Sequence, residues 1–142
     1  MIHDGNLFFV IFILASYIIK PSSSCPFLIP KWTISINNQL DDDVVVHIVS
    51  TDHDLGNHTI TSGSDYQWTF CEKIFATSHF HGYFWKGKKQ QSLALADRKI
   101  MDLCRSEYSI GSVCYWVVMS DEFYVSPTNE PFPSGWEKKK SW

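Results

Sequence analysis

The stretch YQWTFCEKIFATSHFHGYFWKGK, residues 66–88, decides the fold of this chain. Aromatic rings occupy every second position from Tyr66 to Phe70, and Phe80 and Phe84 alternate with polar or amphipathic neighbours. Period-two alternation sends successive side chains to opposite faces of a strand, so both ends of the stretch are predicted to be strands. Because so many large rings are costly to leave in water, we expect these two strands to form the central layer of the core.

The composition indicates one packed domain. The 142 residues are 44% hydrophobic and 15% aromatic, and only 19% are charged, which is below the usual share of about a quarter. A chain of this length fits a single domain. The formal net charge is −3, whereas nucleic-acid-binding proteins need a basic face, so we expect no nucleic-acid partner.

The N-terminal segment has the pattern of a secretory signal peptide. An apolar run from Leu7 to Ile19 is followed by a short segment of small residues that ends at Ser24. The run is shorter than the about 20 residues of a membrane span. We therefore predict that residues 1–24 are a cleaved signal peptide, that residues 25–142 are one domain, and that the mature protein is secreted without stable membrane insertion. The alternative is an uncleaved signal anchor, since no Lys or Arg precedes the run.

All four cysteines lie beyond the predicted cleavage site, at Cys25, Cys71, Cys104 and Cys114. An even number of cysteines in a secreted chain indicates disulfides. Four cysteines allow three pairings, and the sequence does not choose among them. No C-x-x-C motif is present, so neither a zinc ribbon nor a thioredoxin-type motif is supported.

Short strands separated by turn signals run through the rest of the chain. The strands are expected within residues 32–36, 44–50, 59–61, 66–71, 80–85, 91–96, 112–119 and 123–125. This pattern predicts an all-β fold, a small antiparallel β-sandwich of seven or eight strands. Residues 51–58 are expected to form a loop, and residues 97–111 a polar connection with a helical turn near residues 100–104. The chain after Pro127 is expected to be a loosely held tail.

The sequence Asn57-His58-Thr59 is an N-glycosylation sequon, and such sites lie on exposed loops of secreted proteins. We therefore predict that the protein is a glycoprotein with sugar on Asn57.

Two groups of residues resemble parts of metal sites. His79 and His81 leave the same face of a strand, but zinc needs further ligands, and none is evident at a useful spacing. Asp52 and Asp54, with Gly56, resemble half of a calcium loop that lacks its closing glutamate. We therefore predict that the two histidines are ordinary residues of a strand and that the two aspartates lie in a solvated loop. We expect no metal and no other cofactor.

The sequence predicts no enzyme. It contains no nucleophile elbow, no Gly-rich phosphate loop and no H-E-x-x-H motif. His53 and Asp54 are adjacent, but no third group completes a triad. Trp85, Trp136 and Trp142 can be interpreted as a sugar-stacking platform, although tryptophan on a strand more often lies in the interior.

Three segments together resemble a known family. They are VVVHIVSTDHDLGNHTI at residues 44–60, the aromatic stretch at 66–88, and Cys104 and Cys114 with Tyr-Trp and then DEFYV at 121–125. Their order and spacing, behind a signal peptide, resemble the plant self-incompatibility proteins, also called S-protein homologues. The resemblance implies a small secreted β-sandwich. The best-understood members are pistil-secreted ligands that inhibit self pollen, and most other members have no assigned role.

The resemblance also bears on the cysteines. It implies a disulfide between Cys104 and Cys114, which correspond to one cysteine pair of the family. The positions of the other family pair hold Ile48 and Gly82 here, so we expect these two residues to face each other in the core. Cys25 and Cys71 fall outside the family pattern, and whether they pair stays open.

We therefore expect a secreted extracellular signalling or recognition protein whose partner is an unknown cell-surface receptor, and whose finer role is as a ligand in the rejection of self pollen. The oligomeric state stays open. The alternative is a cell-wall carbohydrate-binding module, which needs coplanar exposed rings.

Partner recognition is expected in the connection at residues 97–111, because the aromatic faces build the core and a glycan on Asn57 shields the 51–58 loop. The candidate binding residues are Asp102, Arg105, Glu107 and Tyr108.

Overall fold

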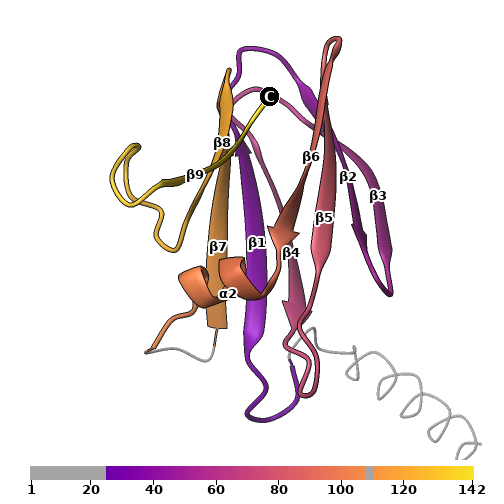
Figure 1. Cartoon of the computed structure of the whole chain (residues 1–142), viewed down its shortest axis with the longest axis vertical. Helices are drawn as coiled ribbons and strands as arrows, with labels where there is room; N and C mark the ends of the chain where they lie inside the picture. Colours follow the sequence, from indigo (N-terminus) through magenta and orange to yellow (C-terminus); the bar gives the residue numbers. More distant parts are fainter. Residues whose placement is uncertain (1–24, 108–110) are drawn as a thin grey trace, which may run out of the picture.

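Two β-sheets pack face to face in this computed structural model, which describes residues 25–107 and 111–142 (Figure 1). The five-stranded sheet has the order β4-β1-β7-β8-β9, and the four-stranded sheet has the order β3-β2-β5-β6. The expectation of a small all-β sandwich is therefore confirmed. The predicted signal peptide, residues 1–24, lies outside the described residues.

The elements follow one another along the chain as nine strands and one short helix within the described residues. Their bounds are β1 Lys31–Asn38, β2 Val44–Ser50, β3 Asp54–Ile60, β4 Asp65–Cys71, β5 Phe80–Lys86, β6 Lys89–Ala96, α2 Arg98–Cys104, β7 Gly111–Val118, β8 Glu122–Ser126 and β9 Glu137–Ser141.

The core lies between the sheets and follows the alternation of the sequence. On β5, Phe80 and Phe84 are buried while Tyr83 and Trp85 are exposed. The two aromatic strands belong to opposite sheets, and their rings meet across the core, with the centroids of Phe70 and Phe80 4.7 Å apart. Of these two strands, β5 is an inner strand of its sheet. The expectation that both strands form the central layer is wrong for β4, which lies at the edge of the five-stranded sheet.

The ladder between β1 and β7 is parallel, whereas the other described ladders are antiparallel. The chain reaches β7 from the other sheet through β6 and α2, and this crossover allows β7 to run in the direction of β1. Trp116 on β7 donates its indole hydrogen to the carbonyl of Leu95 on β6, at 3.0 Å. This bond satisfies a buried polar group and links the two sheets beside the helix.

Two segments differ from the sequence-based expectations, and a third, the helical turn, agrees with them. Residues 54–60 form the edge strand β3, so most of the expected 51–58 loop is paired with β2. The helical turn expected near residues 100–104 is α2, and it begins where Asp97 accepts a hydrogen bond from the amide of Ile100. The tail is not loose at its end, because β9 pairs with β8.

None of the helices in the described part of the chain has the length and apolar character needed to cross a membrane.

Candidate functional site

Three segments meet at one end of the sandwich, which lies at the bottom of Figure 1 and is called the loop end here. They are residues 25–30 before β1, the β4–β5 loop at residues 72–79, and the start of the connection after α2 at residues 105–107. The loop end contains two of the four residues that the sequence nominated for partner recognition, Arg105 and Glu107, together with several that it did not nominate.

Helix α2 positions the connection. Ile100, Met101 and Cys104 are buried, so the helix is anchored by its apolar face. Cys104 and Cys114 form a disulfide that joins the end of α2 to β7, with Cα atoms 5.4 Å apart. The connection between them is therefore closed at both ends, which reduces the entropy that it can lose on binding a partner.

Arg105 fastens this connection to the β4–β5 loop. Its Nη2 atom lies 2.6 Å from Oε1 of Glu72, and its Nη1 atom lies 3.4 Å from Oε2. The guanidinium also lies over the ring of the buried Trp32, 5.3 Å from its centroid. The hydrogen bonds that Arg105 donates to the carboxylate of Glu72 raise the pKa of Arg105 above its ordinary value, so the guanidinium is charged at any physiological pH.

Asp102 and Glu107 are exposed beside this pair. Asp102 and Arg105 line one wall of a hollow of about 460 Å³, and the β4–β5 loop forms the other wall. The remaining sequence-nominated residue, Tyr108, lies outside the described residues. The structure thus places three of the four nominated residues around α2 and adds Glu72 as the partner of Arg105.

The loop end also exposes large apolar side chains. Phe75 is 98% exposed and Ile74 is 71% exposed on the β4–β5 loop, and Phe27 and Leu28 are exposed to 91% and 74% before β1. Exposed apolar residues that gather in one place mark interaction sites more often than scattered ones do. The sequence carried a signal for the first pair, because the adjacent Ile74 and Phe75 break the period-two alternation, but it did not reveal their exposure.

The second disulfide holds these two loops together. Cys25 is bonded to Cys71 at the end of β4, with Cα atoms 5.5 Å apart. The amide of Glu72 donates to the carbonyl of Pro30, at 2.9 Å. Residues 25–30 are therefore tied to the β4–β5 loop. The sequence left open whether Cys25 and Cys71 pair, and the structure shows that they do.

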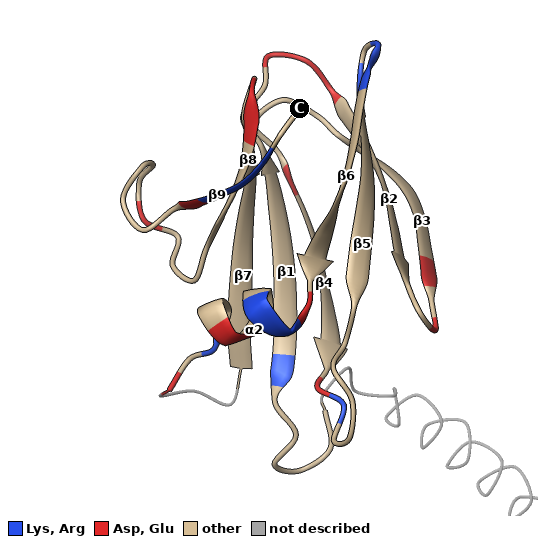
Figure 2. Cartoon of the chain, viewed as in Figure 1, with Lys and Arg blue, Asp and Glu red and all other residues tan. Residues whose placement is uncertain are grey.

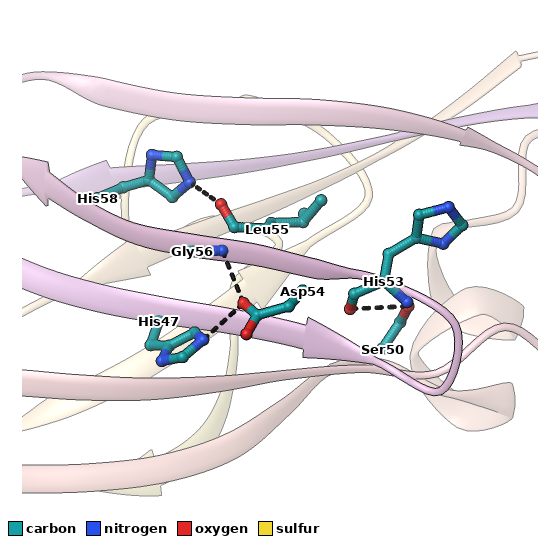
Figure 3. Close-up of polar contacts among 7 residues, drawn as sticks. All are labelled: His47, Ser50, His53, Asp54, Leu55, Gly56 and His58. Carbon is teal, nitrogen blue, oxygen red and sulfur yellow. Dashed lines mark hydrogen bonds and ion pairs between the residues drawn. The ribbon is translucent and has the colours of Figure 1, made fainter.

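Asp54 makes its hydrogen bonds within the β2–β3 hairpin (Figure 3). Oδ1 of Asp54 accepts hydrogen bonds from the amide of Gly56, at 2.8 Å, and from Nε2 of His47, at 2.6 Å. These two bonds, the first more than the second, lower the pKa of Asp54 below its ordinary value. Gly56 has a φ of 79°, a left-handed conformation that glycine adopts without strain.

Asp52 points to a different partner, because it accepts from Nζ of Lys73 at 2.8 Å. The two carboxylates that resembled half of a calcium loop are thus committed to separate contacts. His79 lies exposed before β5, whereas His81 is half-buried within the strand. Among the described residues, no three His, Cys, Asp or Glu side chains form a group that can hold a metal ion.

Asn57 is exposed, but it lies within β3 and not in a loop. Because β3 is an edge strand, the side chain is still accessible to a glycosylating enzyme. The expected sugar on Asn57 remains a prediction.

The three tryptophans considered as a sugar platform do not share a face. Trp142 packs against the core through Phe123, with ring centroids 4.7 Å apart. Trp136 lies in the β8–β9 loop, where its indole donates to the carbonyl of Glu130. Of the three, Trp85 points outward from the four-stranded sheet, with 37% of its surface exposed.

Comparison with known proteins agrees with this architecture. A family model described as plant self-incompatibility protein S1 matches residues 33–142. The self-incompatibility protein S1 of Papaver rhoeas is 30% identical over 122 residues, which cover 84% of this chain and 82% of the relative.

Proposed function

Because the chain belongs to the plant self-incompatibility protein S1 family, we propose that it is a secreted signalling ligand that a protein receptor on a target cell binds at the loop end. The general role of the family in self-incompatibility signalling supports the class of function. In the finer form of the proposal, the chain acts in the rejection of self pollen. Its Papaver rhoeas relative is named as a self-incompatibility protein.

One observation carries the choice of surface. The Arg105–Glu72 pair joins the α2 connection to the loop that exposes Ile74 and Phe75. An apolar centre flanked by charged and polar groups is the usual anatomy of a protein–protein interface, and aromatic and Arg side chains most often dominate its affinity. The two disulfides hold both segments before binding, so little ordering is needed when a receptor engages them.

The predicted signal peptide agrees with an extracellular role. A cleaved segment at residues 1–24 delivers the mature chain to the cell exterior, where disulfides are stable. The mature chain would then begin next to Cys25, whose disulfide is part of the loop end.

The test compares two loop-end variants with a matched control in secreted, folded protein. Ile74→Ser with Phe75→Ser removes the apolar centre, and Arg105→Ala with Glu107→Ala removes the charged flank. Phe132→Ser serves as the control, because Phe132 is 44% exposed on the β8–β9 loop, away from the loop end.

Labelled proteins are applied to pollen tubes and to other plant cells, and both binding and tube growth are measured. Each loop-end variant is expected to weaken binding by at least about tenfold, while the control binds as the wild type does. Equal binding by all variants would place the recognition surface elsewhere. Expression confined to the pistil supports pollen rejection, whereas expression in root or leaf contradicts that finer role.

A further inference from the structure

The outer face of the four-stranded sheet carries a row of exposed rings that the loop end does not use. Tyr83 and Trp85 are 42% and 37% exposed on β5. They are two residues apart, so both project from the same face, separated along the strand by about 6.5–7 Å.

The neighbouring strand β6 adds polar side chains to this face. On β6, Ser92 lies opposite Tyr83, and Gln90 lies opposite Trp85. Together with Gln91, these residues line a hollow of about 330 Å³. Aromatic, amide and hydroxyl groups thus surround one depression on an exposed sheet face.

Both rings are held in place by their neighbours. Nε1 of Trp85 donates to Oε1 of Gln90 at 3.1 Å, which fixes the indole and leaves the amide NH₂ group of Gln90 as a donor for a ligand. The ring of Tyr83 lies near those of His81 and His47, with centroid distances of 5.0 Å and 6.4 Å. A site whose rings are already oriented loses less entropy when a ligand stacks on them.

No side chain that lines the hollow is charged. Figure 2 shows the same pattern on the ribbon, where the blue of Lys and Arg on β5 and β6 is confined to the hairpin tip. The nearby Lys140 is engaged with the carbonyl of Ser92, to which its Nζ donates at 2.6 Å. The chemistry of this face suits a neutral ligand with many hydroxyl groups, since an acidic ligand would find no cation in the hollow.

We propose that this face binds a neutral oligosaccharide from outside the protein. The C–H faces of two pyranose rings stack on Tyr83 and Trp85, and the ring hydroxyls bond to the amide of Gln90 and the hydroxyl of Ser92. The site is a second surface, separate from the receptor-binding loop end, and it gives the protein a means of being retained on a polysaccharide before it meets a receptor.

Soluble hexaoses of β-1,4-glucan, β-1,4-xylan, β-1,4-mannan and β-1,3-glucan are titrated into the full secreted protein by calorimetry, with hexagalacturonate as an acidic probe. At least one neutral probe is expected to bind. Trp85→Ala and Tyr83→Ala should each weaken that binding by about tenfold or more, and Trp85→Phe should lose less because it keeps a ring.

Phe75→Ala is the matched control, because it removes a still more exposed ring at the loop end. It should leave sugar binding unchanged. Circular dichroism shows that each variant is folded, and Gln90→Ala offers a second test that deletes no ring.

Four outcomes overturn the proposal. Failure of every neutral probe to bind excludes the ligand class, and unchanged binding by both ring variants excludes the site. If the sugars bind to the Asn57→Gln variant but not to the wild type, the chain's own glycan fills the face, since Asn57 lies opposite His47 on the neighbouring strand. Binding of hexagalacturonate alone, weakened by salt, also contradicts a neutral ligand.

Discussion

Ile48 on β2 lies directly opposite Gly82 on β5, and both are buried. The family resemblance predicted that these two residues face each other, and the strand register confirms it. The space beside the glycine is occupied, however. A Cβ atom on Gly82 would lie 2.6 Å from Cδ1 of Leu95 and 2.8 Å from Cε2 of Phe84. Leu95 therefore fills the volume that a side chain at position 82 needs.

Gly82→Ala is expected to destabilise the protein by about 1–3 kcal/mol, because the added methyl group overpacks the core against Leu95. Leu95→Ala should also destabilise it, by about 2–5 kcal/mol through a cavity. The double variant should be more stable than the sum of the two changes implies, since each relieves the other. Urea unfolding of the four proteins measures this coupling, and strict additivity would contradict it.

A cysteine pair provides the matching chemical test. Directly opposite residues of an antiparallel ladder have Cα separations that suit a disulfide. Ile48→Cys with Gly82→Cys should therefore oxidise, but the gain should fall below the about 2–4 kcal/mol of an unstrained bond until Leu95 is shortened. Thiols that stay reduced in an oxidising buffer would show that the side chains cannot meet.

The two native disulfides should differ in their contribution to stability. The chain-entropy estimate is about 4 kcal/mol for Cys25–Cys71, with a sequence separation of 46, and about 3 kcal/mol for Cys104–Cys114, with a separation of 10. Replacing each pair by serine should lower the free energy of unfolding in that order. Denaturant titrations of the two variants measure it, and a larger loss for the shorter loop would contradict the entropic account.

The sequence predicted what period-two alternation governs. It placed the buried faces of the aromatic strands correctly because a pleated strand separates apolar from polar side chains. It missed β9, since Glu137–Ser141 is exposed along its whole length and is held by backbone bonds to β8. It missed most of β3 because Asp54 and Gly56 have the composition of a loop while belonging to an edge strand.

The candidate site was predicted less completely than the fold. Asp102, Arg105 and Glu107 were nominated by exclusion, because the aromatic strands build the core and a glycan on Asn57 would shield the 51–58 loop. Their partner Glu72 lies 33 residues from Arg105 in sequence, and no local pattern reveals such a contact. Likewise, the pairing of Cys25 with Cys71 depends on the register of β1 against β4.

The β2–β3 turn should lose stability in acid through Asp54. Its pKa is lowered in the folded state, so its contribution is present above the ordinary carboxyl value of 3.8 and is lost as the pH falls through the folded pKa. Asp54→Asn keeps an acceptor for the Gly56 amide but removes the charge. Amide exchange of Gly56 should rise in acid in the wild type and change less in the variant.

A local measurement is needed because Asp52 and Glu122 also have lowered pKa values, so they contribute to global acid unfolding in the same direction. Asp52→Asn is the control, since its partner is Lys73. An equal loss of the acid response in both variants would show that the Asp54 bonds do not govern the turn.

Trp142 should anchor the C-terminal strand. Its ring packs on Phe123, its indole donates to the carbonyl of Met119 at 2.9 Å, and Nζ of Lys86 lies 4.7 Å from its centroid. Trp142→Ala is expected to cost about 1–3 kcal/mol, less than for a fully buried tryptophan. Trp136→Ala, in the preceding loop, should cost less. Thermal unfolding compares them, and a loose tail would show no loss for either.

The sugar expected on Asn57 should protect an edge of the sheet. Asn57 is exposed on β3, whose outer side has no partner strand among the described residues. An unprotected edge strand offers backbone groups to a second molecule, and a bulky glycan prevents that approach. Asn57→Gln should therefore lose the mass of one glycan, keep its fold, and associate at concentrations where the wild type does not. Thr59→Ala should behave in the same way, because it destroys the sequon without changing Asn57. Mass spectrometry and light scattering of secreted protein provide the test, and an unmodified Asn57 in the wild type would refute both the glycan and its protective role.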